Sequence, residues 1–229
     1  MELHKHENND YGYMKDYVYE VLKKNIIELR LKPGMNLKKE KIAKELEVSI
    51  TPIREAFARL SEDELVDIYP QRGTYVSLIN MKKVEQAKFM REHLERAVAR
   101  LACSDFPEDY ILKLKTNIKM QEIYVEEENY IKLFELDNEF HKIIFDGCNK
   151  GDIWLSIQQL SNHVSRSRIL SLAANFNGNE LIVEHQKIVE AIQQGDKELA
   201  DRIITKHISR IKFDSDKLTT EYPGYFEKQ

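Results

Sequence analysis

The chain has 229 residues, of which 42% are hydrophobic and 32% are charged, and its formal net charge is −4 at pH 7. This length suits two domains of ordinary size, each large enough to enclose a core. No apolar run approaches the roughly 20 residues of a membrane span, and the N-terminus is no signal peptide. We therefore expect a cytoplasmic protein with no membrane partner. Cys103 and Cys148 fit no zinc spacing and are expected to be free thiols.

A first helix is predicted from Asp10 to Leu31 and ends before Pro33 and Gly34. Between positions 23 and 44 there are eight Lys or Arg residues and two Glu residues, so the local net charge is 8 − 2 = +6. Such a basic stretch suits contact with phosphate groups. A solvated helix face would give the same pattern.

Two short helices joined by a tight turn follow. The first is predicted from Lys39 to Leu46, and the second lies within residues 48–60. Ser49 or Thr51 caps the second helix, and the sequence does not decide between them, while Pro52 suits its first turn. This is the pattern of a helix-turn-helix, in which the second helix approaches the DNA.

A β-hairpin is predicted directly after the second helix. Residues 65–69 and 74–78 alternate between apolar and polar side chains, and residues 70–73 form the turn. A hairpin in this place is a wing, whose tip residue Arg72 could enter a minor groove, with Gly73 allowing the backbone to come close. The candidate DNA-contacting residues are Lys39, Ser49, Thr51, Arg54, Arg59, Arg72 and Gly73.

The order of these segments resembles the winged helix of GntR-type bacterial transcription regulators. The matching stretches are Lys32–Leu37, Ile42–Ala43, Val48–Phe57, Arg72–Gly73 and Val76. The family usually has Arg immediately before the Thr-Pro pair, where this chain has Ile50. An isoleucine cannot pair with a guanine edge, although it could touch a thymine methyl group.

The remainder of the chain carries no convincing strand signal. Six helices are predicted, over residues 81–103, 107–127, 129–146, 150–173, 179–194 and 196–215. Their short connections imply antiparallel neighbours in an all-α bundle. We expect a mainly α protein with a winged helix-turn-helix domain at 10–78 and an effector-binding helical domain at 80–216. The tail after Lys217 is expected to be frayed.

Four metal-ligating side chains interrupt apolar stripes of three predicted helices. Asp137 and His141 lie four residues apart within one stripe, and His185 and His207 lie in two others. A cation would compensate the cost of burying the carboxylate. Alternatively, each histidine is a hydrogen-bonded core residue and Asp137 pairs with His141. His163 lies between polar residues and receives no metal role.

The same half of the chain resembles the effector-binding domain of the FadR-like branch of GntR regulators, the FCD domain. The resemblance rests on Asp137–His141, on Glu184–Ile188 with Ala191–Ile192 and Gly195–Asp196, and on His207. It implies a divalent metal held by Asp137, His141, His185 and His207, and an effector that is a small carboxylate. Three imidazoles favour zinc or nickel over calcium.

Arg91 occupies the one polar place in an apolar stripe that runs from Val84 to Leu101. A guanidinium there needs an anion, and Glu92 and Glu95 are expected to point to other faces. We predict that Arg91, with Arg168 as a second candidate, binds the effector carboxylate. Alternatively, Arg91 reaches the end of the bundle or pairs with a buried glutamate.

Two classes of function follow from these patterns. The first is a transcription regulator that binds operator DNA as a homodimer and responds to a small carboxylate. The rival is a metal-dependent helical enzyme, since three histidines and an aspartate can also activate water. The sequence identifies no further acid or base beside the metal ligands. It also does not give the operator, the effector, or the direction of regulation.

Overall fold

The computed structural model describes residues 3–5, 13–175 and 178–228, so the predicted helix start at Asp10 lies outside the described residues. The chain forms two compact units. The first, here called the winged unit, extends to Met81 and also contains the segment that begins at Glu221. The second, the helical unit, spans Lys82–Thr220. Among the described residues, no helix is both long enough and apolar enough to cross a membrane.

Three helices build the winged unit: α1 (Met14–Ile27), α2 (Lys39–Leu46) and α3 (Ile50–Glu62). The first ends earlier than predicted, because the chain turns at Leu29, whose φ is +59°. Of the two residues that the sequence left open, Ser49 stands at the N-cap position of α3, although its side chain makes no capping hydrogen bond.

A three-stranded antiparallel sheet completes this unit, in the order β1-β3-β2. The predicted hairpin is present as β2 (Val66–Tyr69) and β3 (Gly73–Val76), with Val66 opposite Val76. The third strand, β1 (Asn36–Leu37), has only two residues and was not predicted. The turn of the hairpin uses Gly73 at a φ of +115°, a conformation that side chains disfavour.

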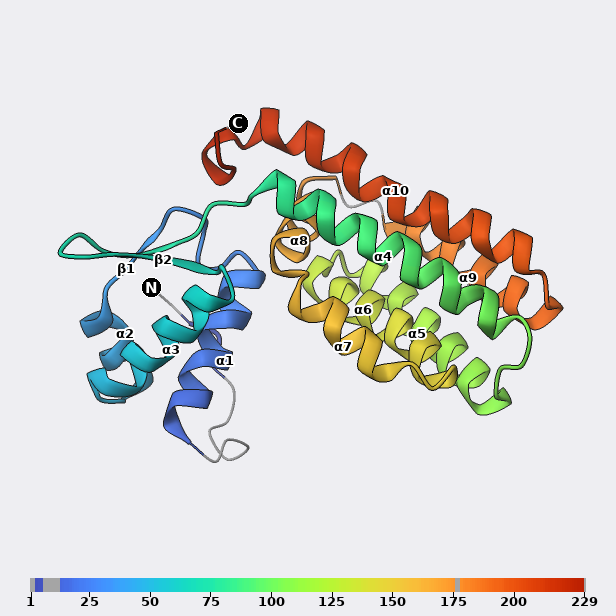
Figure 1. Cartoon of the computed structure of the whole chain (residues 1–229), viewed down its shortest axis with the longest axis horizontal. Coiled ribbons are helices and arrows are strands. Elements are labelled where there is room, and N and C mark those ends of the chain that lie inside the picture. Colours follow the sequence, from blue (N-terminus) through green and yellow to red (C-terminus); the bar gives the residue numbers. More distant parts are fainter. Residues whose placement is uncertain (1–2, 6–12, 176–177, 229) are drawn as a thin grey trace. The chain divides into compact units, whose positions relative to one another are not determined.

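The helical unit is an all-α bundle, as predicted (Figure 1). Its helices are α4 (Met81–Ala102), α5 (Glu108–Glu126), α6 (Tyr130–Gly147), α7 (Gly151–Gln159), α8 (Asn162–Asn175), α9 (Gly178–Gln194) and α10 (Lys197–Glu221). In Figure 1, α4 and α10 lie side by side, and Arg96 donates two hydrogen bonds of 2.8 and 2.9 Å to Asp201 between them. The prediction of one helix over 150–173 is wrong, because the chain breaks at Leu160 and Ser161 and begins a new helix.

The C-terminal tail is ordered against the winged unit, so the expectation that it frays is wrong. A short 3-10 turn, η2 (Pro223–Tyr225), leads to Phe226, which forms a parallel β-bridge with Ile79. The Ile79 amide donates to the Tyr225 carbonyl at 2.8 Å, and the Glu227 amide donates to the Ile79 carbonyl at 3.1 Å. Phe226 and Ile79 are both buried.

Candidate metal centre and nucleic-acid interface

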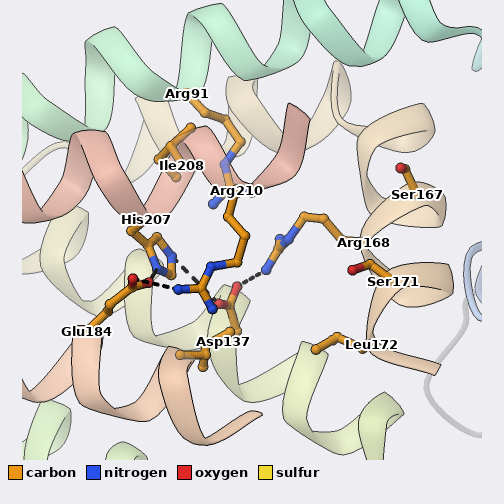
Figure 2. A pocket seen from close by; sticks show the side chains of 11 residues that line it. Arg91, Asp137, Ser167, Arg168, Ser171, Leu172, Glu184, His207, Ile208 and Arg210 are labelled. Atoms are coloured by element: carbon orange, nitrogen blue, oxygen red, sulfur yellow. Dashed lines mark hydrogen bonds and ion pairs between the residues drawn. The ribbon is translucent and has the colours of Figure 1, made fainter. Parts of the chain in front are cut away.

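The four predicted metal ligands converge in the core of the helical unit. Asp137 and His141 come from α6, His185 from α9 and His207 from α10, and all four are buried. One ligand atom from each lies within 4.8 Å of the others. Figure 2 shows Asp137 and His207 on the wall of the neighbouring pocket.

The ligand atoms have separations that suit a single ion. The Nε2 atoms of His141 and His207 are 3.1 Å apart. Oδ1 of Asp137 is 3.6 Å from Nε2 of His185 and 4.0 Å from Nε2 of both other histidines. Two ligands of one ion, each bound at about 2.0–2.2 Å, lie about 3–4 Å apart.

Carboxylates orient two of the imidazoles from behind. Nδ1 of His141 is 2.8 Å from Oε2 of Glu95, and Nδ1 of His207 is 3.1 Å from Oε2 of Glu184. Since an ionised carboxylate only accepts hydrogen bonds, Nδ1 of His207 carries the proton in its hydrogen bond with Glu184. The close contact with Glu95 favours the same tautomer for His141, although Oε2 of Glu95 has no hydrogen-bond partner within the described residues. Each Nε2 then presents its lone pair to the centre, as a metal ligand requires.

An amide relay orients the third imidazole. Oε1 of Gln121 is 2.8 Å from Nδ1 of His185. The Gln121 amide group donates to Oδ1 of Asn117 at 2.6 Å, and Asn117 in turn donates to the carbonyl of Leu136 at 3.1 Å. This relay fixes the amide of Gln121 so that its oxygen faces His185, and His185 Nε2 points to the centre.

The centre shows the features of a cation site. Within the described part of the chain, Asp137 Oδ1 and His185 Nε2 are buried without a hydrogen-bond partner. The lone pairs of His141 and His207 face each other across 3.1 Å, which is unfavourable unless a cation or a proton lies between them. Asp137 and His141 are too far apart, at 4.0 Å, for the hydrogen bond of the alternative interpretation. A divalent ion would satisfy all four groups.

The acids around the centre are ionised despite their burial. Burial raises the pKa of Asp137, but Arg168 and the neighbouring imidazoles lower it more, so this pKa lies well below its usual range. Burial acts in the same way on Glu95, where Arg91 and His141 bring the pKa down to about 2. Both carboxylates are therefore anionic at neutral pH.

Burial keeps two of the imidazoles neutral. It lowers the pKa of His185 well below the ordinary value, and the neighbouring His207 adds to this effect. Burial also lowers the pKa of His207, although the hydrogen bond with Glu184 raises it in part. Neutral imidazoles are the form that binds metal ions.

Arg91 does not lack an anion within its own helix. Its Nε donates to Oε1 of Glu95 at 2.6 Å, so the expectation that Glu95 points to another face is wrong. Arg91 is 1% exposed, and Nη2 of its guanidinium has no hydrogen-bond partner in the described part of the chain. The apolar stripe beside it also ends earlier than expected, because Leu101 is 45% exposed.

A cavity of about 60 Å³ lies beside the four ligands. Figure 2 shows Arg91 and Arg168 pointing into it, and Arg168 pairs with Oδ2 of Asp137. The side chains that line it are Arg91, Asp137, Ser167, Arg168, Ser171, Leu172, Leu181, Glu184, His207, Ile208 and Arg210.

The break before α8, the helix that carries Ser167, Arg168 and Ser171, was not predicted, although Ser161 and Asn162 are residues that favour helix starts.

Sequence reasoning missed four polar residues of this site. Glu95, Glu184 and Arg210 stand three or four residues from, or next to, predicted site residues in the same helices. That proximity was a usable signal. Gln121 lies on α5, which carries none of the predicted ligands, and nothing in its sequence context indicated a role.

In the winged unit, six of the seven candidate DNA-contacting residues are exposed: Ser49, Thr51, Arg54, Arg59, Arg72 and Gly73. Lys39 is half-buried. Arg59 is half-exposed, and its guanidinium lies 3.6 Å from the ring centre of Tyr19 and 3.2 Å from Asp16 on α1. Within the basic stretch, Lys24 and Arg30 both pair with Glu28.

Both halves of the chain match known families. Residues 14–76 match the bacterial regulatory proteins of the gntR family, and residues 88–210 match the FCD domain. The HTH-type transcriptional repressor RspR of Escherichia coli K12 is 31% identical over 212 residues, which are 93% of each chain. A probable D-xylose utilization operon transcriptional repressor of Paenarthrobacter nicotinovorans is 25% identical over 80% of each chain.

Solved structures share the fold. Escherichia coli McbR/YncC superposes with a TM-score of 0.76 at 21% identity, covering 90% of this chain and 99% of that one. A putative GntR transcriptional regulator from Rhodococcus sp. RHA1 gives a TM-score of 0.73 at 18% identity, covering 91% of this chain and 98% of that one.

Proposed function

The chain belongs to the gntR family of bacterial regulatory proteins and carries an FCD domain, and we propose that a small carboxylate bound beside a divalent metal ion controls its affinity for operator DNA. Its relatives are named transcriptional regulators, so the chain is a DNA-binding transcriptional regulator and not an enzyme. The observation that carries this proposal is the convergence of Asp137, His141, His185 and His207 beside a cavity lined by arginines.

The DNA-binding half of the proposal rests on α3 and the wing. Thr51 and Arg54 are exposed near the start of α3, where recognition helices contact bases. Arg72 is exposed in the turn between β2 and β3, and suits a minor groove. Arg59 remains a candidate phosphate contact, with its side chain braced by Tyr19 and Asp16 of α1.

The assembly follows from the way such units read DNA. A recognition helix reads one half-site, and two half-sites related by a two-fold axis require two copies. We therefore propose a homodimer. Because RspR of Escherichia coli is named a repressor, we also propose that the DNA-bound form represses transcription.

The metal half rests on the donor set. Three imidazoles and one carboxylate suit zinc or nickel. When bound, such an ion supplies a positively charged Lewis acid to which an effector oxygen can coordinate. The residues around it position that oxygen, because Arg168 pairs with Oδ2 of Asp137 and leaves Oδ1 for the ion.

The effector half rests on the guanidiniums of Arg91 and Arg168, which both line the cavity. The Nη2 atom of Arg91 has no hydrogen-bond partner within the described residues. Arg168 donates to Asn138 at 3.1 Å as well as to Asp137, which fixes its planar group at the wall. Guanidiniums bind carboxylates through paired hydrogen bonds, so both suit an anionic effector.

The experiment is a thermal-shift screen of small carboxylates on the full chain, with and without a chelator, followed by operator titration with each hit. We expect at least one acid to raise the melting temperature only when metal is present and to change operator affinity. A protein that binds operator but holds no metal, or whose hits are indifferent to the chelator, would contradict the proposal.

A further inference from the structure

Each arginine of the cavity pairs with a buried carboxylate. Glu95 pairs with Arg91, Asp137 pairs with Arg168, and Glu184 pairs with Arg210 at 2.6 Å. These three pairs sum to zero charge. Two exposed side chains of opposite charge add to these pairs, Lys206 beside Glu184 and Glu180 beside Arg210, and their charges also sum to zero.

A divalent ion bound at this balanced site would add two positive charges. Buried net charge is costly unless counter-charges accompany it. A ligand with a single carboxylate neutralises only one of the two charges, whereas a dianion neutralises both. The charge balance therefore favours a ligand with two anionic groups.

Arg210 is the residue placed to bind the second group. One side of its guanidinium is fixed by Glu184, whose side chain is 6% exposed. The other side contacts Glu180 at 3.0 Å, and the Glu180 side chain is 72% exposed. Exposed ion pairs contribute little to stability, so a ligand carboxylate can replace Glu180 at small cost. Figure 2 shows the Arg210 guanidinium beside Glu184 and His207 at the pocket.

The size of the cavity limits the ligand. About 60 Å³ corresponds to roughly five water positions. Only a short molecule can place one carboxylate at the inner end, near Arg91, and another at Arg210, whose side chain is 23% exposed. Leu172, Leu181 and Ile208 provide apolar walls for a short carbon chain.

We infer that the effector is a small dicarboxylate whose second carboxylate binds Arg210 in place of Glu180. This inference rests on the proposed function, since it assumes a metal-dependent carboxylate site. It adds the ligand's second charged group and the residue that selects for it.

The test uses titration calorimetry on the zinc-loaded full chain with three matched pairs of acids: propionate and succinate, lactate and malate, pyruvate and oxaloacetate. Within a pair, the second acid differs by one added carboxylate. We expect at least one dicarboxylate to bind about tenfold or more tightly than its partner, because a charge-assisted paired contact contributes an effect of that size. The half-ester that masks the added carboxylate should lose this gain.

Two variants assign the effect to Arg210. Arg210→Gln should remove most of the preference for the dicarboxylate, with a much smaller change for the monocarboxylate. The matched variant Glu180→Gln removes the competing carboxylate and should tighten dicarboxylate binding a few-fold. Metal content and circular dichroism check that both variants are folded and loaded.

The outcomes separate this inference from the function on which it rests. Equal affinities within every pair, or an equal loss for both acids in Arg210→Gln, would overturn the dicarboxylate inference while leaving a metal-dependent carboxylate regulator intact. No binding by any of the six acids in the metal-loaded protein would overturn the proposed function together with the inference.

Discussion

At the scale of single residues, the groups behind the imidazoles matter as much as the imidazoles themselves. Gln121 accepts from Nδ1 of His185, and its own orientation is fixed by Asn117. Partners of this kind set the tautomer and direction of a metal-binding histidine, and their loss typically lowers metal affinity about 10–100-fold.

Replacing Gln121 with leucine should therefore weaken metal binding about 10–100-fold without removing any ligand. Competition with a chromophoric chelator measures this affinity. Gln121→Glu keeps an acceptor for His185 and should retain the metal, and Gln159→Leu changes an exposed glutamine of α7 as a control. An unchanged affinity in Gln121→Leu would show that the relay does not orient His185.

Replacing His185 with alanine should remove the metal, because the site loses one of its four ligands. Elemental analysis of the purified protein should give about one ion per chain for the original sequence and much less for the variant. His93→Ala removes an exposed histidine of α4 and should keep the ion. Full metal content in His185→Ala would contradict the ligand assignment.

Arg54 is the arginine of α3 whose side chain is exposed and close to the helix start. Arg54→Ala should cost about 1–3 kcal/mol of operator binding, the usual contribution of a base-contacting arginine. Titration of the cognate operator at fixed salt concentration measures this loss, and metal content should not change. Arg202→Ala alters an exposed arginine of α10 as the control. Equal operator affinity for both variants would exclude Arg54 from the interface.

At the scale of helices and strands, the sequence predicted what apolar periodicity and turn residues encode. Lys39–Leu46 was predicted with its observed bounds, and the wing was found from its alternation and its glycine turn. The break at Ser161 was missed because no glycine or proline marks it; there, the Ser161 hydroxyl donates to the Ile157 carbonyl at 2.6 Å. β1 was missed because two residues carry no periodicity.

The site shows the same division. Periodicity could place Asp137 and His207 on inward faces, since each interrupts an apolar stripe. It could not show that Arg91 and Glu95 pair. Periodicity assigns each residue to a helix face, whereas residues four apart can contact each other through long side chains even when they are assigned to different faces. It also could not find Gln121, since contacts between α5 and α9 depend on tertiary packing.

Helix packing in the bundle predicts that Gly147 does not tolerate a side chain. A Cβ atom on Gly147, the last residue of α6, would lie 2.4 Å from the ring of Phe106 and 3.1 Å from Tyr110. Because Tyr110 limits how far that ring can move, Gly147→Ala should cost about 1–3 kcal/mol. Thermal denaturation measures the loss. Gly224→Ala is the matched control, since a Cβ atom there would meet no atom within 4 Å.

At the scale of the whole molecule, the chain passes between its two units twice, after Met81 and again before Glu221. The second passage returns the C-terminal segment to the winged unit, where Phe226 pairs with Ile79. Ile79 is 0% exposed and Phe226 is 4% exposed, so the tail pairs with a buried residue two positions before α4. The winged unit is therefore incomplete without residues that are distant in sequence.

Deleting residues 222–229 should destabilise the winged unit by about 2–4 kcal/mol. The deletion removes two backbone hydrogen bonds and the burial of Phe226, and it uncovers Ile79. The single tryptophan, Trp154, is buried in the helical unit and reports the unfolding of that unit alone. Circular dichroism reports both units.

The deletion should accordingly lower the melting temperature of the circular-dichroism transition that belongs to the winged unit, while the Trp154 fluorescence transition and the metal content stay nearly unchanged. Phe226→Ala should reproduce most of the loss, because Phe226 is the buried hydrophobic side chain of residues 222–228. Lys228→Ala alters an exposed position of the same tail and should have no effect. If the deleted protein melted as the full chain does in both signals, the packing of the tail would contribute nothing to the winged unit. A shift confined to Trp154 would instead place its contribution in the helical unit.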